Sequence, residues 1–269
     1  MKKLSVFFLL LLSSFATADL KQELDEQLDP LMSKVIAWRH NLHQNPELSN
    51  REYKTSKKVA THLRSLGIKV ETKIAYTGVV GLIEGGLPGP TIALRADMDA
   101  LPVEEKTGLP FASKERATYL GQSVGVMHAC GHDGHTSMLL GAAKYLSENN
   151  DFDGSVYFIF QPGEEGFAGG QKMIQDGMFD DFKIDEVYAL HNWPELPIGS
   201  IGVNSGPMMA AVDEFDIVVK GRGGHAAIPQ LAIDPVVIAS QIVLAVQTIV
   251  SRSTDPVDKA LISITKITN

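Results

Sequence analysis

The pattern of apolar and polar residues predicts helices that alternate with strands over most of the chain. Apolar residues recur at helical spacing in residues 19–43, 51–66 and 135–149. Short apolar runs typical of strands lie at residues 68–74, 79–84, 91–96, 155–160 and 187–190. Strands that alternate with helices form a mostly parallel sheet sandwiched by helices, so the sequence predicts an α/β fold.

A change of pattern near Pro207 predicts a second domain. Residues 214–220 alternate apolar and polar side chains, as in a half-exposed strand. Asp234 and Pro235 have the residue types of an N-cap and a first helical position, and they open an apolar helix that runs to about Arg252. Residues 260–265 read as a further strand. We therefore expect one domain over residues 19–207 and an incomplete α+β domain over residues 208–269.

The N-terminal segment is typical of a secretory signal peptide. Lys2 and Lys3 precede an apolar run over residues 4–15, and Ala16-Thr17-Ala18 is a small-x-small cleavage site. We expect residues 1–18 to be removed and the chain to be exported to the periplasm or secreted. The alternative is an uncleaved anchor, but the apolar run is short for a bilayer, so no stable membrane anchor is expected.

Composition narrows the class of partner. A hydrophobic content of 44% and a charged content of 21% are those of an ordinary globular protein. The net charge is −8, and no basic patch stands out in the sequence. Nucleic acid is therefore not an expected partner.

The stretch from Met127 to His135 is the strongest chemical signal. It holds the only cysteine and three of the eight histidines. Cys130 and His132 lie two residues apart, and thiolate and imidazole are preferred ligands of zinc-like cations. A lone cysteine in an exported chain is free, paired between molecules, or bound to metal. The alternative is a small buried thiol without a ligand role.

Further candidate ligands follow three of the predicted strands. Asp97 and Asp99 follow the strand over residues 91–96, Glu164 and Glu165 follow the strand over residues 155–160, and His191 follows the last. Parallel strands end at the same edge of a sheet, so these side chains can converge. Simpler interpretations stay open at this point: a solvated turn for the two aspartates and a surface dipeptide for the two glutamates.

Two histidines near the end of the first helix have a structural alternative. His40 and His43 lie on one helix face, and a hydrogen-bonded helix end is the favoured interpretation over a ligand role.

The Glu164-Glu165 pair suits hydrolysis at a two-metal site, because neighbouring side chains on extended backbone point opposite ways. One carboxylate can then bind metal while the other acts as general base towards water.

Six ordered motifs resemble one family of enzymes. The chain resembles the amidohydrolases that include hippurate hydrolase, bacterial N-acyl-amino-acid amidohydrolases and plant indole-acetyl-amino-acid hydrolases, within the aminoacylase/carboxypeptidase metallopeptidases. The resemblance covers the chain from about residue 30 to its end. The motifs are Arg39-His40-x-x-His43-x-x-Pro46-Glu47-Leu48, Arg95-Ala96-Asp97-Met98-Asp99-Ala100-Leu101, His128-Ala129-Cys130-Gly131-His132-Asp133, Gly163-Glu164-Glu165-Gly166, His191-Asn192-Trp193 and Gly224-His225-Ala226-Ala227-x-Pro229.

The resemblance implies a role for each matching residue. Two divalent ions (zinc, manganese, nickel or cobalt) would be held by Cys130, His132, Glu165 and His191. Glu164 would be the general base and Asp99 a carboxylate that supports the ligands. His225 would help bind the oxyanion from a dimerisation domain, in some relatives across a homodimer interface. The implied reaction is hydrolysis of an N-acyl-amino acid to a carboxylic acid and a free amino acid.

One departure from the family bears on activity. In the family, a segment that returns from the small domain supplies the last ligand histidine, whereas the 44 residues after His225 contain no histidine. We therefore expect residues 19–207 to be the N-terminal part of a catalytic domain and the 269-residue chain to be poorly stable and weakly active or inactive. The alternative functions are a metal-binding remnant without turnover and, from Gly121-Gln122-Ser123-Val124-Gly125, a serine hydrolase that uses Ser123.

Overall fold

The structure is a computed structural model that describes residues 2–268; the side chains of residues 2–21 and of Glu23 lie outside the description. The chain divides into two compact units, Met1–Gly199 and Ser200–Asn269. The sequence analysis places this boundary at residues 207 and 208. That the two parts are a catalytic and a dimerisation domain stays a prediction.

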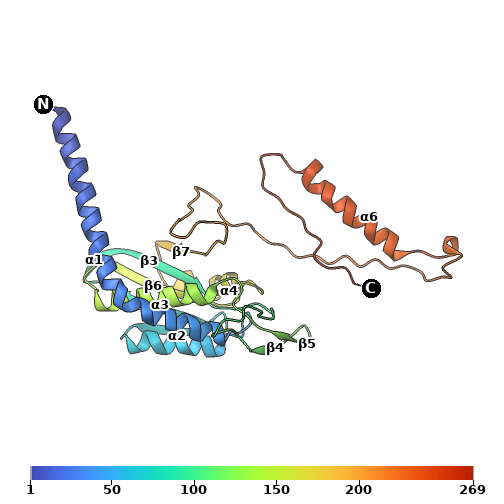
Figure 1. Cartoon of the computed structure of the whole chain (residues 1–269), viewed down its shortest axis with the longest axis horizontal. Helices are drawn as coiled ribbons and strands as arrows, with labels where there is room; N and C mark the ends of the chain where they lie inside the picture. Colours follow the sequence, from blue (N-terminus) through green and yellow to red (C-terminus); the bar gives the residue numbers. More distant parts are fainter. Residues whose placement is uncertain (1, 269) are drawn as a thin grey trace. The chain divides into compact units, whose positions relative to one another are not determined.

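The first unit is built on a five-stranded sheet in the order β1-β2-β6-β3-β7. Its strands β3, β6 and β7 are labelled in Figure 1. Its strands are β1 (Lys69–Ile74), β2 (Gly78–Glu84), β3 (Leu87–Asp97), β6 (Asp153–Gln161) and β7 (Glu186–Ala189). β3 runs parallel to β6 and β7, whereas β2 runs antiparallel to β1 and β6. The α/β class is confirmed, and the sheet is mixed where a mostly parallel one was predicted. Residues 75–77 join β1 to β2, which is too short a connection for a parallel crossover.

Helices cover both faces of this sheet. They are α1 (Lys2–Gln44), α2 (Tyr53–Ser65), α3 (His132–Glu148), α4 (Gly169–Gln175) and α5 (Met178–Asp181). Phe158 and Phe160 on β6 join a core with α2 and α3, while Ile159 between them joins a second core with α4 and α5. Side chains alternate between the faces of a strand, and both faces are covered here. The apolar run in β6 is therefore continuous.

The helix predicted over residues 19–43 is part of α1, which contains Pro30. The predicted signal peptide, residues 1–18, belongs to the segment whose side chains lie outside the described residues. Near its C-terminal end α1 packs closely on α3. A Cβ added to Gly141 would lie 2.9 Å from Cγ2 of Val35, so the two helices need a glycine at this contact.

A two-stranded antiparallel sheet of β4 (Arg116–Tyr119) and β5 (Gln122–Gly125) carries Ser123. The hydroxyl of Ser123 accepts a hydrogen bond from Nε of Arg116 at 3.3 Å. The serine-hydrolase alternative is therefore wrong. A nucleophile elbow needs a sharp turn between a strand and a helix, whereas Ser123 lies inside a strand of a hairpin.

The second unit contains one long helix, α6 (Pro235–Thr248), which continues as a π-helix over Ile249–Ser253 (Figure 1). Asp234 caps it as predicted, because its side chain accepts a hydrogen bond from the backbone N–H of Val236 at 2.9 Å. By length and composition alone, Pro235–Ser253 is apolar enough to cross a membrane, the one such helix in the part of the chain that was searched.

The strands predicted at residues 214–220 and 260–265 are wrong for this structure, which gives these segments no strand. A strand forms only where a neighbour accepts and donates its backbone hydrogen bonds. In the described part of the second unit, the β-type pairing is a single bridge between Arg222 and Ile233. The alternating pattern is present in the sequence, but the paired neighbour is not.

Candidate metal centre

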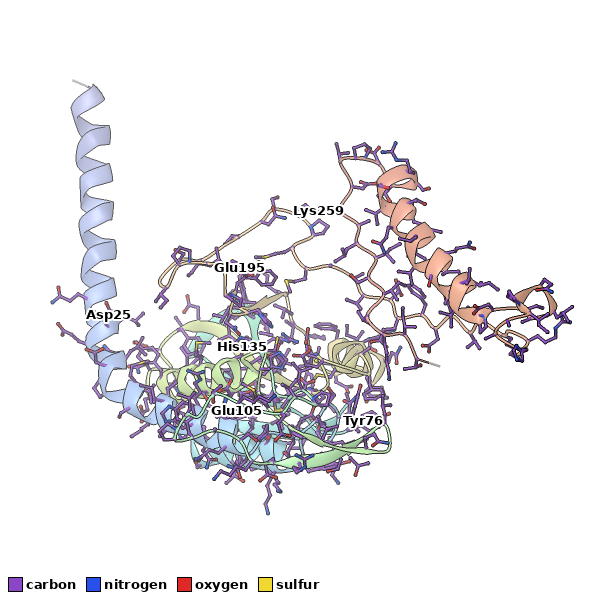
Figure 2. All side chains as sticks on the ribbon, turned by 45° about the vertical axis from the view of Figure 1, so that its right-hand side comes forward. Asp25, Tyr76, Glu105, His135, Glu195 and Lys259 are labelled. Atoms are coloured by element: carbon purple, nitrogen blue, oxygen red, sulfur yellow. The ribbon has the colours of Figure 1, made fainter. Side chains whose placement is uncertain are left out.

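The candidate ligands gather where the parallel strands end. Asp97 ends β3, Glu164 and Glu165 follow β6, and His191 follows β7. The register pairs Asp97 with Gln161 at the end of β6, which brings these ends to one edge. α3 begins at His132 beside the same edge, and His135 lies among the densely packed side chains there (Figure 2). The convergence expected from the strand order is therefore present.

His132 is the centre of the cluster and is fully buried. Its Nδ1 lies 2.9 Å from the backbone carbonyl oxygen of Asp99 and 3.2 Å from Oδ1 of the same residue. A carbonyl oxygen only accepts, so Nδ1 carries the hydrogen and the neutral ring keeps its lone pair on Nε2. Within the described residues, Nε2 has no hydrogen-bond partner. A buried lone pair without a partner is costly unless a ligand uses it.

His191 is oriented in the same way as His132. Its Nδ1 lies 2.8 Å from the backbone oxygen of Asn192, so this nitrogen donates. The other ring nitrogen, Nε2, lies 3.3 Å from Sγ of Cys130. Both imidazoles thus hold their Nδ1 hydrogens on main-chain oxygens and turn Nε2 into the cluster. This is the arrangement found in metal-bound histidines.

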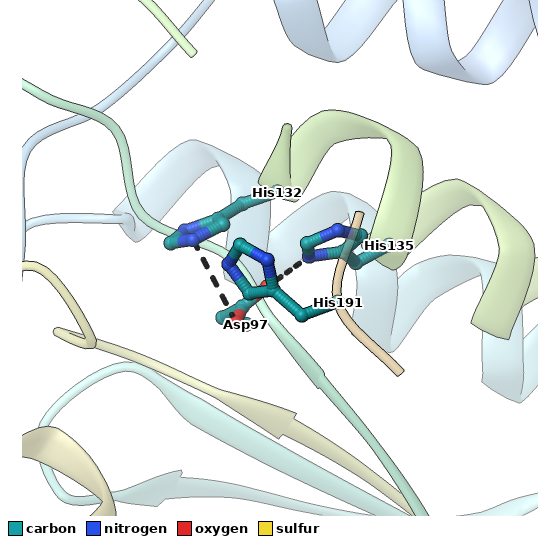
Figure 3. Close-up of side chains that lie close together, drawn as sticks. All are labelled: Asp97, His132, His135 and His191. Atoms are coloured by element: carbon teal, nitrogen blue, oxygen red, sulfur yellow. Dashed lines mark hydrogen bonds and ion pairs between the residues drawn. The ribbon is translucent and has the colours of Figure 1, made fainter. Parts of the chain in front are cut away.

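Two overlapping groups of side chains could hold cations. In the first, one atom each from Cys130, His132 and Glu165 lies within 4.8 Å of the others. Oε1 of Glu165 is buried, has no hydrogen-bond partner among the described residues, and lies 3.8 Å from Nε2 of His132. The second group has the same spacing and contains Asp97, His132, His135 and His191 (Figure 3). Both groups contain His132, whose free Nε2 can bind one cation, so these side chains form a candidate site for a divalent cation.

Glu164 lies beside the cluster and is partly open to solvent. Its side chain is 37% exposed, against 18% for Glu165, and its Oε2 lies 3.9 Å from Nε2 of His132. The two neighbouring carboxylates thus differ in burial. The more buried one suits a ligand, and the more open one can reach a water and a substrate.

Sequence reasoning missed the part that His135 plays. Its Nδ1 lies 2.7 Å from Oδ1 of Asp97, and its Nε2 lies 2.6 Å from the side-chain Oδ1 and 3.1 Å from the backbone nitrogen of Asn192. His135 therefore links the end of β3 to the residue after His191. The i,i+3 spacing of His132 and His135 places both rings on one face of α3 and is the signal that could have found it.

The pKa values of the ionisable groups in the cluster are shifted from their ordinary values. Burial alone would raise the pKa of Asp97, but the hydrogen bond from His135 and the neighbouring His132 and Arg95 outweigh it and lower that pKa. Burial likewise opposes the charged form of Asp99, and hydrogen bonds from His132 and Ser49 lower its pKa overall. For His132, burial alone would lower the pKa, but the hydrogen bond to Asp99 and the negative charges of Asp97, Asp99 and Glu165 together outweigh it and raise that pKa. These pairings keep both aspartates ionised.

The surroundings of the Cys130 thiol, in contrast, disfavour its charged form. Burial and the neighbouring carboxylate of Glu165 raise the pKa of Cys130 to about 12. Burial also raises the pKa of Glu165. A divalent cation among these side chains would reverse both effects, since it stabilises thiolate and carboxylate. The donor set, with its unpaired buried Nε2 and Oε1, fits such a cation.

The residues of the first motif form a separate polar cluster. Nδ1 of His43 lies 3.0 Å from Oδ2 of Asp133, and its Nε2 lies 3.2 Å from Oε1 of Glu105. Arg39 donates to the same Oδ2 of Asp133 at 3.1 Å. The ring of His40 stacks on Phe111 with 3.8 Å between ring centroids. The favoured interpretation, a hydrogen-bonded helix end, is confirmed for His43, whereas His40 makes a ring contact.

One predicted site residue lies in the other unit. His225 belongs to Ser200–Asn269, where its Nδ1 accepts the backbone N–H of Ala227 at 3.1 Å. Its role in oxyanion binding stays a prediction, as do the individual ligand roles of Cys130, His132, Glu165 and His191.

An α/β fold with a Cys/His/Glu cluster at the strand ends is typical of metal-binding proteins, and comparison with known proteins gives the family. The model of Peptidase family M20/M25/M40 matches residues 93–265, and the chain belongs to this family. The resemblance stated from the six motifs is thereby confirmed.

Two characterised relatives and one solved structure are similar to the chain. It is 47% identical to N-acetyl-L-cysteine deacetylase of Bacillus subtilis, over 89% of this chain and 56% of the relative. It is also 47% identical to hippurate hydrolase of Campylobacter jejuni, over 84% of this chain and 57% of the relative. The B. subtilis YXEP protein, titled a dinuclear metal binding peptidase, is 42% identical with a TM-score of 0.59, over 65% of this chain and 46% of that one. The chain thus spans somewhat over half the length of these two relatives.

Proposed function

We propose that this protein hydrolyses the amide bond of N-acyl-amino acids with two divalent metal ions. The observation that carries the proposal is the convergence of Cys130, His132, Glu165 and His191, with Nε2 of His132 and Oε1 of Glu165 buried and unpaired among the described residues. Similar proteins that act on acylated amino acids support the substrate class. The dinuclear structure of similar fold supports two ions.

The role of each side chain in the proposed reaction follows from its position in the cluster. Bound divalent ions lower the pKa of a water molecule and polarise the acyl carbonyl under attack. Glu164, the more open carboxylate, takes a proton from the attacking water and passes it to the leaving nitrogen. The water oxygen joins the acyl carbon, the C–N bond breaks, and a carboxylic acid and a free amino acid result. Asp99 holds His132 in its tautomer throughout.

The test is amine release by the purified full chain loaded with manganese or zinc. We expect slow release of free amino acid from hippurate or N-acetyl-cysteine, in line with the weak activity expected from the sequence, loss of this activity with a chelator, and its return with metal. Glu164→Gln should abolish release while the metal content stays at two ions per chain. Two bound ions without any release from either substrate would overturn the proposal and leave the metal-binding remnant as the better account.

We also propose export and self-association. The basic, apolar and small-residue segments of residues 1–18 support removal of a signal peptide. N-terminal sequencing of the protein from the producing cell should find Asp19 first, and an intact Met1 would contradict export. The family resemblance supports a homodimer in which His225 reaches the substrate. A sedimentation experiment on the full chain tests the dimer, and a monomer at all concentrations would contradict it.

A further inference from the structure

We propose that Glu52 is a positioning residue, whose buried carboxylate holds the loop that carries Glu164 and Glu165 in place for the reaction. This inference rests on the proposed function for its kinetic part, whereas its metal-binding part stands independently. Glu52 is fully buried, and it lies in the segment between the first motif and α2.

The carboxylate of Glu52 joins three distant segments. Its Oε1 accepts the backbone N–H of Asn50 at 2.8 Å and the backbone N–H of Gly163 at 2.8 Å. Its Oε2 accepts the hydroxyl of Thr77 at 2.5 Å. Gly163 directly precedes Glu164. A single side chain thus fixes the start of the catalytic loop to the residues before α2 and to the β1–β2 connection.

Glu52 is at a position where an acidic side chain normally serves its own helix. It is the N-cap residue of α2, yet its side chain makes no capping hydrogen bond. Glu47 takes over that task, since its carboxylate accepts the backbone N–H groups of Lys54 and Thr55 at 3.1 and 2.8 Å. An N-cap side chain ordinarily satisfies these donors. The carboxylate of Glu52 is therefore free to bind Asn50, Thr77 and, in the loop, Gly163.

The loop approaches this segment closely, and residue 163 has the left-handed backbone that favours glycine. Gly163 has φ +57°, and a Cβ there would lie 2.6 Å from Oδ1 of Asn50. The other end of the loop is held by a second buried carboxylate, since Asp99 accepts the backbone N–H of Glu165 at 2.9 Å. Glu164 therefore lies between two backbone groups that are each bound to a buried acid. This is the arrangement needed to hold a base and a ligand in register.

A buried carboxylate is costly, which argues against a filling role. Burial raises the pKa of Glu52, and the hydrogen bonds from Thr77 and from backbone N–H groups only partly offset it. An apolar side chain would fill the same space without that cost. The carboxylate is explained by the two N–H groups and the hydroxyl that it holds.

The experiment compares Glu52→Ala and Glu52→Gln with matched changes at Glu47. Glu47 also accepts three hydrogen bonds, including the hydroxyl of Thr55 at 3.0 Å, but all of them serve α2. Each full-length variant is measured for manganese affinity, kcat, KM and Tm. We expect Glu52→Ala to weaken manganese binding about 10–100-fold and to lower kcat more than it changes KM. Glu52→Gln keeps an acceptor oxygen and should restore most of both.

Glu47→Ala should lower Tm but leave manganese affinity and kcat of the folded chain unchanged. Equal losses of manganese affinity in Glu52→Ala and Glu47→Ala would overturn the proposal. If Glu52→Ala does not fold, Thr77→Val, which removes one of the three hydrogen bonds, gives the same comparison in a milder form. If the wild type binds manganese but releases no amino acid, the proposed function fails, and manganese affinity alone still decides the role of Glu52.

Discussion

Asp99 holds the ring of His132 by two of its oxygens, the backbone carbonyl at 2.9 Å and the carboxylate Oδ1 at 3.2 Å from Nδ1. The other carboxylate oxygen, Oδ2, accepts the hydroxyl of Ser49 and the backbone N–H of Glu165. One aspartate therefore sets the tautomer of one candidate ligand and the backbone position of another. The residue after a buried strand is well suited to this, because the strand fixes its backbone.

The first prediction concerns Asp99→Ala. The variant leaves the ring of His132 held by the main-chain carbonyl alone and frees the N–H of Glu165. We expect manganese affinity to fall about 10–100-fold, as it does when partners of metal ligands are removed elsewhere. Isothermal titration calorimetry measures this. Asp185→Ala is the control, since Asp185 accepts the N–H of Thr91 at 2.8 Å near the other end of β3. A similar loss in both variants would count against the role of Asp99.

The second prediction concerns protons released when metal binds. Burial and Glu165 raise the pKa of Cys130 to about 12, so the thiol is protonated at pH 7. Binding as a thiolate must release that proton, and affinity should therefore rise with pH. Calorimetry in buffers of different ionisation enthalpy should show about one proton more per chain for the wild type than for Cys130→Ser. Equal proton release from the two chains would show that Cys130 is not a ligand.

Much of the cluster could be predicted from the sequence because parallel strands end together. Asp97, Glu165 and His191 are far apart in the chain, yet each follows a strand, and β3, β6 and β7 run the same way. Cys130 and His132 are close in the sequence and needed no fold to be noticed. In both cases a short stretch of sequence is enough. Residues two apart are near each other in any fold, and residues at the ends of parallel strands meet at one edge of the sheet.

The roles of Glu52 and His135 could not be predicted in the same way. Glu52 belongs to the helix predicted over residues 51–66 and to none of the six motifs, and its bond to Gly163 spans 111 residues. The contact of His135 with Asn192 spans 57 residues.

In the second unit, by contrast, the sequence predicts strands at residues where the structure has none. Residues 214–220 carry the alternation of a strand, but alternation describes one segment, whereas a strand also needs a paired neighbour.

The third prediction concerns acid sensitivity and His128. This ring is buried, and both of its nitrogens lack a hydrogen-bond partner among the described residues. Burial lowers its pKa from 6.5 to about 4. Between pH 4 and pH 6.5, His128 is therefore protonated in the unfolded chain and neutral in the folded chain. The free energy of unfolding falls as the pH falls from about 6.5 to 4. Over this window the histidine should cost about 3 kcal/mol of the free energy of unfolding.

His128→Leu removes this titration and fills the site with an apolar side chain. In urea unfolding with a chelator present, the variant should lose less stability than the wild type on going from pH 7 to pH 4. Titrating groups far from His128 are common to both chains and cancel in the difference, so the residual reports His128 and the neighbours that interact with its ring, among them Asp133. Parallel pH profiles for the two chains would contradict the assignment of this acid sensitivity to His128.

The last prediction concerns the backbone of the catalytic loop. Gly163→Ala places a Cβ 2.6 Å from Oδ1 of Asn50 and forces alanine to adopt φ +57°. We expect a loss of about 1–3 kcal/mol in the free energy of unfolding, from the left-handed backbone and the steric contact together. In an Asn50→Gly background the contact is absent, and only the backbone cost of the alanine stays. The penalty of Gly163→Ala should therefore be smaller there, with a coupling of about 1 kcal/mol in a double-mutant cycle of urea unfolding. If the effects of Gly163→Ala and Asn50→Gly are strictly additive, residue 163 does not contact the side chain of Asn50 in solution.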